Sequence, residues 1–313
     1  MRIGILFLGA SRLVGLLERF RQAATVEGVT LDLFSLEDSS PWHAIAVAGV
    51  AQAIAGPPFN GPDFKGFFQR QITEHAVDIV IPNIDSATIS VAQCRGELES
   101  RVLPVVSSVE MCQAMHDKLA ADKLFRSHEL PLPGRVRWPL LAKPRFGSSS
   151  RGHVVFQNEE QYRFWASQHS ADDYIVQEFL AGTEYSVDAF VDRGGRILGT
   201  VSRIRRIVSG GEVMVTETHN NPPVLELAKR VAGLPGWYGP LNIQIMDTAQ
   251  GPYLLEVNPR FGSGVTCAIE AGLDVPRWIL RERLGRSLPT SPIVWKSGLC
   301  MTRARKDYFQ WLS

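Results

Sequence analysis

Hydrophobic residues form short unbroken runs in the first third of the chain. The runs typical of strands buried in a parallel sheet occupy residues 3–9, 31–36, 77–82 and 102–108. Helical spacing of apolar residues over 11–24, and a segment at 65–76, predict intervening helices. This alternation predicts a small doubly wound parallel sheet. Its substrate-facing loops should follow the strands, at residues 9–12 and 83–86. The first turn lacks the GxGxxG pattern of dinucleotide binding.

A different pattern appears near residue 250. Two alternating apolar runs, 241–246 and 253–257, flank a polar turn that contains Gly251, which predicts a β-hairpin. Alternate side chains of a strand share a face. The expected groups on one face are Asn242, Gln244 and Met246 on the first strand, and Leu254, Glu256 and Asn258 on the second.

Glu256 is an unexpected residue for this hairpin, because it lies between Leu255 and Val257. A buried carboxylate costs several kcal/mol unless a positive group pairs with it. One interpretation is a divalent cation held by the oxygens of Gln244, Glu256 and Asn258, a ligand type that Mg²⁺ prefers. The other is a solvent-exposed hairpin edge. The hairpin alone favours the second interpretation.

A lysine and a Gly/Ser-rich loop lie between two further predicted strands, 140–143 and 153–156. Small residues in the loop, including Ser148 and Ser149, would let backbone N–H groups approach phosphate oxygens, and Lys143 would add a charge. The loop lacks the GxxxxGK[ST] order. A plain turn is the alternative, but the lysine immediately before the loop favours phosphate binding.

Three arginines lie on the predicted strand at residues 199–209, with Arg203 and Arg205 on one face and Arg206 on the other. A solvated basic edge is the usual explanation for such a strand. An arginine that grips a substrate carboxylate or the transferred phosphate is the alternative.

Composition limits the classes of partner. The 313 residues suggest about two domains, and 45% hydrophobic with 21% charged residues is typical of a globular protein. A net charge of +1 predicts no nucleic-acid partner. The four cysteines are widely spaced, which argues against a zinc site and against disulfides and fits a reducing cytoplasm. They are Cys94, Cys112, Cys267 and Cys300. The sequence shows no apolar run of membrane-spanning length and no signal-peptide pattern, so we expect a cytoplasmic protein without membrane contact.

Four sequence blocks resemble the ATP-grasp superfamily, especially its carbamoyl-phosphate-synthase-like branch. In order they are MHDKLAADKLFRSHELPLP, LLAKPRFGSSSRGHVVF, YIVQEFLAGTEYSVDAFVD, and LNIQIM followed by LLEVNPRFGSG. The resemblance covers roughly residues 108–266. It implies an α/β and α+β protein with a Rossmann-like domain over 1–107 and a two-lobed ATP-grasp domain over 108–313. The small lobe would span about 108–178 and the large lobe about 179–313.

The same resemblance implies roles for individual residues. Lys118 and Lys143 would reach the phosphates of ATP under the loop with Ser148 and Ser149. Residues implied to contact adenine and ribose are Glu178, Phe179, Leu180 and Glu184; those implied to bind Mg²⁺ (or Mn²⁺) are Gln244, Glu256 and Asn258. The residues themselves leave simpler readings open: a solvated Lys118 at a helix end, and exposed positions for Glu178 and Glu184.

The function implied is an ATP- and Mg²⁺-dependent, C–N bond-forming and ADP-producing ligase. Such an enzyme activates a substrate carboxylate as an acylphosphate, which an amine or other nucleophile then attacks. Lys143 and Arg260 would be its catalytic cations. Its expected partners are a small-molecule carboxylate and an amine, with a homodimer as a further expectation. The alternatives are a kinase-like phosphotransferase and a non-catalytic ATP-binding protein.

Overall fold

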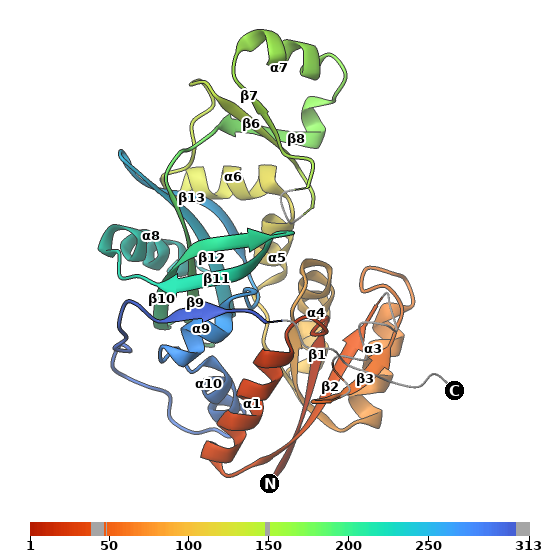
Figure 1. The fold of residues 1–313 in the computed structure, drawn as a ribbon. Helices are drawn as coiled ribbons and strands as arrows, with labels where there is room; N and C mark the ends of the chain where they lie inside the picture. Colours follow the sequence, from red (N-terminus) through yellow and green to blue (C-terminus); the bar gives the residue numbers. More distant parts are fainter. Residues whose placement is uncertain (39–46, 48, 148–150, 305–313) are drawn as a thin grey trace.

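The computed structural model describes residues 1–38, 47, 49–147 and 151–304. Within these ranges the strands form three sheets, of five, three and six strands (Figure 1). The five-stranded sheet comes first in the chain, and the small three-stranded sheet lies at the opposite end of the molecule in this view. The six-stranded sheet lies between these two sheets. Its residues line both of the cavities that form the candidate site.

The N-terminal sheet is parallel, with strand order β3-β2-β1-β4-β5. Its strands are β1 (Arg2–Leu8), β2 (Thr30–Glu37), β3 (Gln52–Ala55), β4 (Val77–Pro82) and β5 (Leu103–Pro104). Its helices are α1 (Val14–Glu27), α3 (Phe64–Glu74) and α4 (Asp85–Leu98). Alternate residues of β1 enter two hydrophobic clusters, Phe7 on one face and Leu6 on the other. Burial on both faces explains the unbroken apolar run, and confirms the predicted doubly wound sheet.

A small antiparallel sheet follows, with order β7-β6-β8. Its elements are β6 (Leu140–Pro144), β7 (Val154–Phe156), α7 (Glu159–Ala166), the 3₁₀ turn η1 (Ala171–Asp173) and β8 (Tyr174–Glu178). Helices α5 (Val109–His116) and α6 (Lys118–Ser127) precede it. Ser108 caps α5 by accepting a hydrogen bond from the Met111 N–H at 3.2 Å.

The large sheet is antiparallel, with order β13-β12-β9-β10-β11-β14. Its strands are β9 (Thr183–Val191), β10 (Ile197–Ser209), β11 (Glu212–Thr218), β12 (Gly239–Thr248), β13 (Gly251–Asn258) and β14 (Cys300–Thr302). Helix α8 (Pro222–Ala232) packs against one face; α9 (Val265–Glu270) and α10 (Val275–Arg283) lie beside α1 (Figure 1). One hydrophobic cluster runs from Phe7 of β1 to Phe190 of β9 and Trp278 of α10, joining the two sheets.

The predicted hairpin is confirmed as β12 and β13, but its second strand does not alternate as expected. Gln244 pairs with Glu256, while the next pair along is Ile245 with Leu254, so Leu255 forms a bulge. Leu254 therefore lies in the hydrophobic core, and the expectation that it shares a face with Glu256 is wrong.

Candidate active site

Two cavities meet at the β12–β13 hairpin. The first, here called the inter-sheet cavity, has a volume of about 350 Å³ and lies between the carboxyl edge of the N-terminal sheet and the large sheet. The second, the lysine cavity, measures about 240 Å³ and lies between the small sheet and the large sheet. Four residues line both cavities: Arg205, Gly211, Gln244 and Glu256. Of these, Arg205 forms an ion pair with Glu184. The hairpin thus forms the wall between the cavities together with Arg205 of β10 and Gly211, which follows β10.

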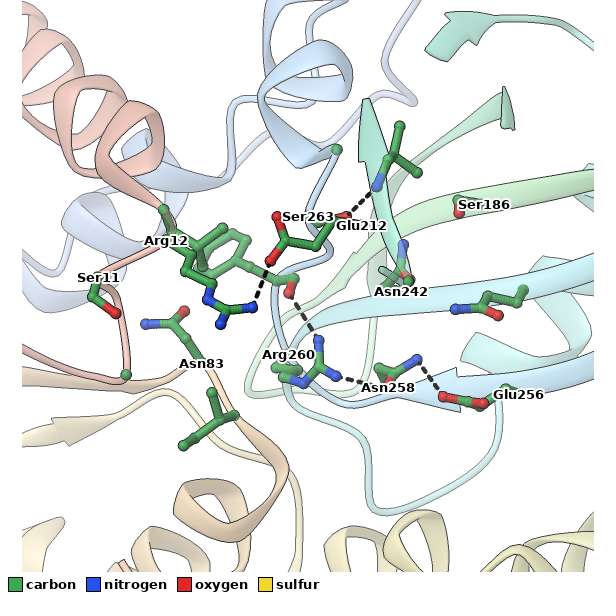
Figure 2. A pocket seen from close by; sticks show the side chains of 18 of the residues that line it. Ser11, Arg12, Asn83, Ser186, Glu212, Asn242, Glu256, Asn258, Arg260 and Ser263 are labelled. Atoms are coloured by element: carbon green, nitrogen blue, oxygen red, sulfur yellow. Dashed lines mark hydrogen bonds and ion pairs between the residues drawn. The ribbon is translucent and has the colours of Figure 1, made fainter. Parts of the chain in front are cut away.

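The three predicted metal ligands lie on this hairpin, and Figure 2 labels two of them, Glu256 and Asn258. Gln244 and Glu256 are direct cross-strand neighbours. Asn258 Nδ2 donates to Glu256 Oε1 at 3.0 Å, and Asn258 Oδ1 accepts from Arg260 Nη2 at 2.9 Å. In the described residues no three His, Cys, Asp or Glu side chains gather as a metal site. A metal at this hairpin would therefore have one carboxylate and amide oxygens as ligands.

Basic side chains outnumber acidic ones in the lysine cavity, which is lined by Lys118, Lys143, Arg151 and Arg205 and by Glu184 and Glu256. Burial lowers the pKa of Lys143, and Lys118 lowers it further, while Glu256 and Glu184 oppose the shift. Burial and these two lysines also lower the pKa of His153 to about 4. Such a cavity suits an anion with several charged oxygens.

Lys118 also holds the loop that follows β6. Its Nζ donates to the Gly147 carbonyl at 2.7 Å, and the neighbouring Asp117 forms an ion pair with Arg145 at 2.5 Å. The lysine begins α6, so the expected helix end is in fact a helix start. Ser148 and Ser149 lie outside the described residues.

A small, mainly apolar cavity adjoins the lysine cavity and has a volume of about 40 Å³. Its walls include Phe125, Ile175, Leu254 and Val257. Gln177 lines this cavity, whereas its described walls do not include Glu178, Phe179 or Leu180, the residues expected to read adenine.

Glu178 and Phe179 make contacts with the preceding segment. Glu178 Oε1 accepts from the Arg137 N–H at 3.1 Å, and the Phe179 N–H donates to the Pro139 carbonyl at 2.8 Å. Glu184, the expected ribose contact, lines the lysine cavity and pairs with Arg205 at 3.0 Å. The nucleotide contacts of these residues stay predictions.

The arginines of β10 divide as the sequence predicts. Arg203 and Arg205 line the inter-sheet cavity, whereas Arg206 forms a solvent-exposed pair with Glu217. Arg203 is fully buried, and its Nε donates to Asp188 Oδ2 at 2.7 Å. Asp188 Oδ1 accepts from Asn242 Nδ2 at 3.0 Å, which completes a buried polar network. Arg203 is thus a buried, hydrogen-bonded residue of the cavity wall, and the explanation as a solvated basic edge does not apply to it.

Arg260 connects the hairpin to the N-terminal sheet. Its Nε donates to Asp85 Oδ1 at 2.6 Å, and Asp85 is the first residue of α4. Burial opposes ionisation of Asp85, but the charge and hydrogen bond of Arg260 outweigh it, so the pKa of Asp85 is lowered. Asp85 lies in the loop 83–86 that the sequence predicts to face a substrate, but neither it nor Asp188 or Glu37 was given a role of its own. Acidic residues within or directly after apolar strands are the signal that could have found them.

Comparisons with known proteins agree with this architecture. The family model described as "ATP-grasp in the biosynthetic pathway with Ter operon" matches residues 170–306. The carbamoyl phosphate synthase large chain of Clostridium beijerinckii is 30% identical over 139 residues, which are 40% of this chain and 13% of the synthase. The match therefore spans only a small part of that relative.

Two solved structures share the fold over most of the chain. The N5-carboxyaminoimidazole synthetase of Staphylococcus aureus, complexed with ADP, has a TM-score of 0.72 at 14% identity, covering 94% of this chain and 81% of that one. The biotin carboxylase domain of Hydrogenobacter thermophilus 2-oxoglutarate carboxylase, crystallised as a dimer with MgADP and bicarbonate, has a TM-score of 0.69 at 16% identity. It covers 92% of this chain and 71% of that one. These likenesses confirm the mixed fold class expected from the sequence. Among the helices of the described residues, none is long and apolar enough to cross a membrane.

Proposed function

We propose that this chain, which belongs to the ATP-grasp superfamily, is a ligase that activates a substrate carboxylate with ATP for attack by an amine or other nucleophile. The observation that carries the proposal is the position of Glu256. It lies on the wall shared by a cavity rich in positive charge and a second cavity large enough for another small molecule. ATP in the lysine cavity and a carboxylate in the inter-sheet cavity would meet at this wall.

The residues of the hairpin fit a magnesium ion. Gln244, Glu256 and Asn258 offer oxygen atoms, and a single carboxylate leaves room for the negative charge of phosphate oxygens. Asn258 Oδ1 accepts one hydrogen bond, from Arg260, so its second lone pair would remain for the ion. The ion, Mg²⁺ or Mn²⁺, would neutralise charge on the phosphates. The biotin carboxylase domain with this fold was crystallised as a dimer, and a homodimer of this chain remains an expectation.

The chain's own groups would do the remaining work by position and charge, since phosphoryl transfer needs little covalent help from the protein. Lys143, buried beside Glu256, would bind phosphate oxygens. Lys118 would hold the covering loop through the Gly147 carbonyl. Arg260 would face the developing acylphosphate, because its guanidinium is fixed at the hairpin end by Asp85. The nucleophile would enter from the inter-sheet cavity.

The test is an ADP-release screen over small carboxylic acids and amines, with products identified by mass. We expect Mg²⁺-dependent ADP release and a condensed product. A phosphorylated product that accumulates would indicate the kinase-like alternative instead. ATP binding without turnover under any condition would indicate a binding protein.

The Glu256→Gln variant links this chemistry to the hairpin. Removing the only carboxylate among the proposed ligands should lower Mg²⁺-dependent ADP release by roughly a hundredfold or more, since it removes charge stabilisation of several kcal/mol. Glu226→Gln, at an exposed position of α8, is the matched control. ADP release by Glu256→Gln at the wild-type rate would refute the metal assignment.

A further inference from the structure

The inter-sheet cavity has an acidic wall that the proposed chemistry does not use. Glu37 ends β2, is buried, and lines this cavity together with Asp38. Glu37 Oε1 accepts hydrogen bonds from the Ala10 N–H at 3.1 Å and the Ser35 hydroxyl at 2.6 Å. Among the described residues, no group donates to Glu37 Oε2, and no lysine or arginine pairs with Glu37. A buried carboxylate of this kind needs a partner with positive charge.

Asn83 adds a third acceptor to the same wall. It follows β4, and its Nδ2 donates to the Ile81 carbonyl at 3.3 Å. Only two buried polar side-chain atoms of the described residues lack a hydrogen-bond partner, Asn83 Oδ1 and Arg205 Nε. Both residues line the inter-sheet cavity. Because buried polar atoms are nearly always paired, an acceptor and a donor left over at one cavity point to a ligand.

The opposite wall carries the positive groups. Arg205 lies there on β10, and Arg260 lies two residues after β13. Arg205 pairs with Glu184 and Arg260 with Asp85, but the Nε of Arg205 has no partner among the described residues. The one arginine on the N-terminal wall, Arg12, is engaged by Glu212 at 3.1 Å, and Glu212 also pairs with Arg303. The cavity thus offers oxygen acceptors on the N-terminal sheet and nitrogen donors beside the hairpin. A molecule with a protonated amine and a carboxylate would satisfy both walls.

The geometry points to an amino acid as the carboxylate substrate, with its ammonium group held by Glu37, Asp38 and Asn83. Its carboxylate faces Arg205 and Arg260, at the wall shared with the lysine cavity. The placement of the substrate's carboxylate rests on the proposed function. The placement of its ammonium group rests on the acidic wall. Two neighbouring carboxylates favour a cation over a neutral hydroxyl group.

The test compares matched sets of small acids by calorimetry, with the whole chain saturated with Mg²⁺ and a non-hydrolysable ATP analogue. The sets are the twenty L-amino acids, the series glycine, β-alanine, 4-aminobutanoate and 5-aminopentanoate, and the deaminated and hydroxylated counterpart of each. We expect at least one amino acid to bind tenfold or more tightly than its deaminated and hydroxylated counterparts. The chain length of the best straight-chain compound would measure the distance between the two walls.

Two variants assign the preference to the acidic wall. Glu37→Gln keeps an oxygen for the Ala10 N–H, and Asp38→Asn leaves the buried hydrogen bonds of β2 intact. Each should lower the preference for the amine about tenfold and leave binding of the deaminated acid unchanged. Asp32→Asn, on the same strand but paired with Arg2 on the surface, is the control.

Equal binding of amino acids and their counterparts would overturn the inference, and so would an amine preference unchanged in both variants. ADP release is measured separately with ATP. Amine-dependent binding without any ADP release would refute the proposed function and support the subsite. ADP release driven only by acids that lack an amine would support the proposed function and refute the ammonium subsite.

Discussion

Replacing Glu27 by Gln should weaken the contact between α1 and α10. Glu27 is the last residue of α1 and is buried among three arginines. Its Oε1 accepts from Arg277 Nε at 2.5 Å and Arg281 Nη1 at 3.0 Å, and its Oε2 accepts from Arg286 Nη1 at 2.6 Å. The cluster fixes the N-terminal sheet against the large sheet, and thereby the two walls of the inter-sheet cavity.

The pKa of Glu27 gives the size of the effect. Burial alone would raise this pKa, but the hydrogen bonds from Arg277, Arg286 and Arg281 outweigh burial and lower it from 4.5 to about 2. That difference corresponds to about 3 kcal/mol of folding free energy. Arg277 and Arg286 are 39% and 43% exposed, so solvent screening reduces the value. We expect Glu27→Gln to lose about 2 kcal/mol at pH 7.

The pH dependence has a defined sign. A carboxylate whose pKa is lowered on folding stabilises the protein fully above its unfolded value of 4.5, and this stabilisation disappears as the pH falls towards 2. Urea unfolding at pH 7 and pH 3 measures the difference between wild type and Glu27→Gln, which should shrink by more than half at pH 3. Glu18→Gln, exposed on the same helix, is the control. A difference that is absent at pH 7, or equal at both pH values, would refute the reasoning.

Two further predictions concern the proposed site. Lys143→Ala should weaken ATP binding about tenfold or more without unfolding the protein, because the buried ammonium group of Lys143 lines the lysine cavity. Calorimetry measures the ATP affinity of this variant against that of Lys123→Ala, a control at an exposed position. An unchanged ATP affinity in Lys143→Ala would remove Lys143 from the site. Arg260→Lys should lower kcat much more than ATP affinity, because lysine cannot contact Asp85 and Asn258 as the guanidinium does. A raised KM for ATP with unchanged kcat would instead make Arg260 a nucleotide anchor.

Local patterns in the sequence predicted much of this architecture. The apolar runs gave the main strands of the N-terminal sheet, because burial on both faces leaves an unbroken signal. The short, partly exposed strand β3 was missed, because four residues of mixed burial carry too little pattern. On the hairpin, alternation correctly brought Gln244 and Glu256 together. It failed at Leu254, because a bulge changes the face of every residue beyond it and leaves no mark in the apolar pattern.

The contacts within the site join residues that are far apart in the sequence, and a single sequence does not show which of these residues meet. Arg260 was identified from its place after the hairpin, but its partner Asp85 lies 175 residues away in the N-terminal sheet. Asp188 and Arg203 lie on adjacent strands, and strand alternation predicted only the face that each occupies. Glu37 and Asn83 come to one wall because parallel strands end at one edge, which places the end of β2 and the residue after β4 beside one cavity.

The N-terminal sheet therefore contributes more than a scaffold for the site. Asp85 holds Arg260, Arg260 donates to Asn258, and Asn258 donates to Glu256, so one hydrogen-bonded chain runs from α4 to the proposed metal ligands. An amide oxygen has two lone pairs, so Asn258 Oδ1 could keep its hydrogen bond from Arg260 and still face a metal ion. Asp85 and Asn258 would then hold the guanidinium of Arg260 together, on the wall of the inter-sheet cavity. A fixed donor at this position is what the proposed acylphosphate oxygen would need.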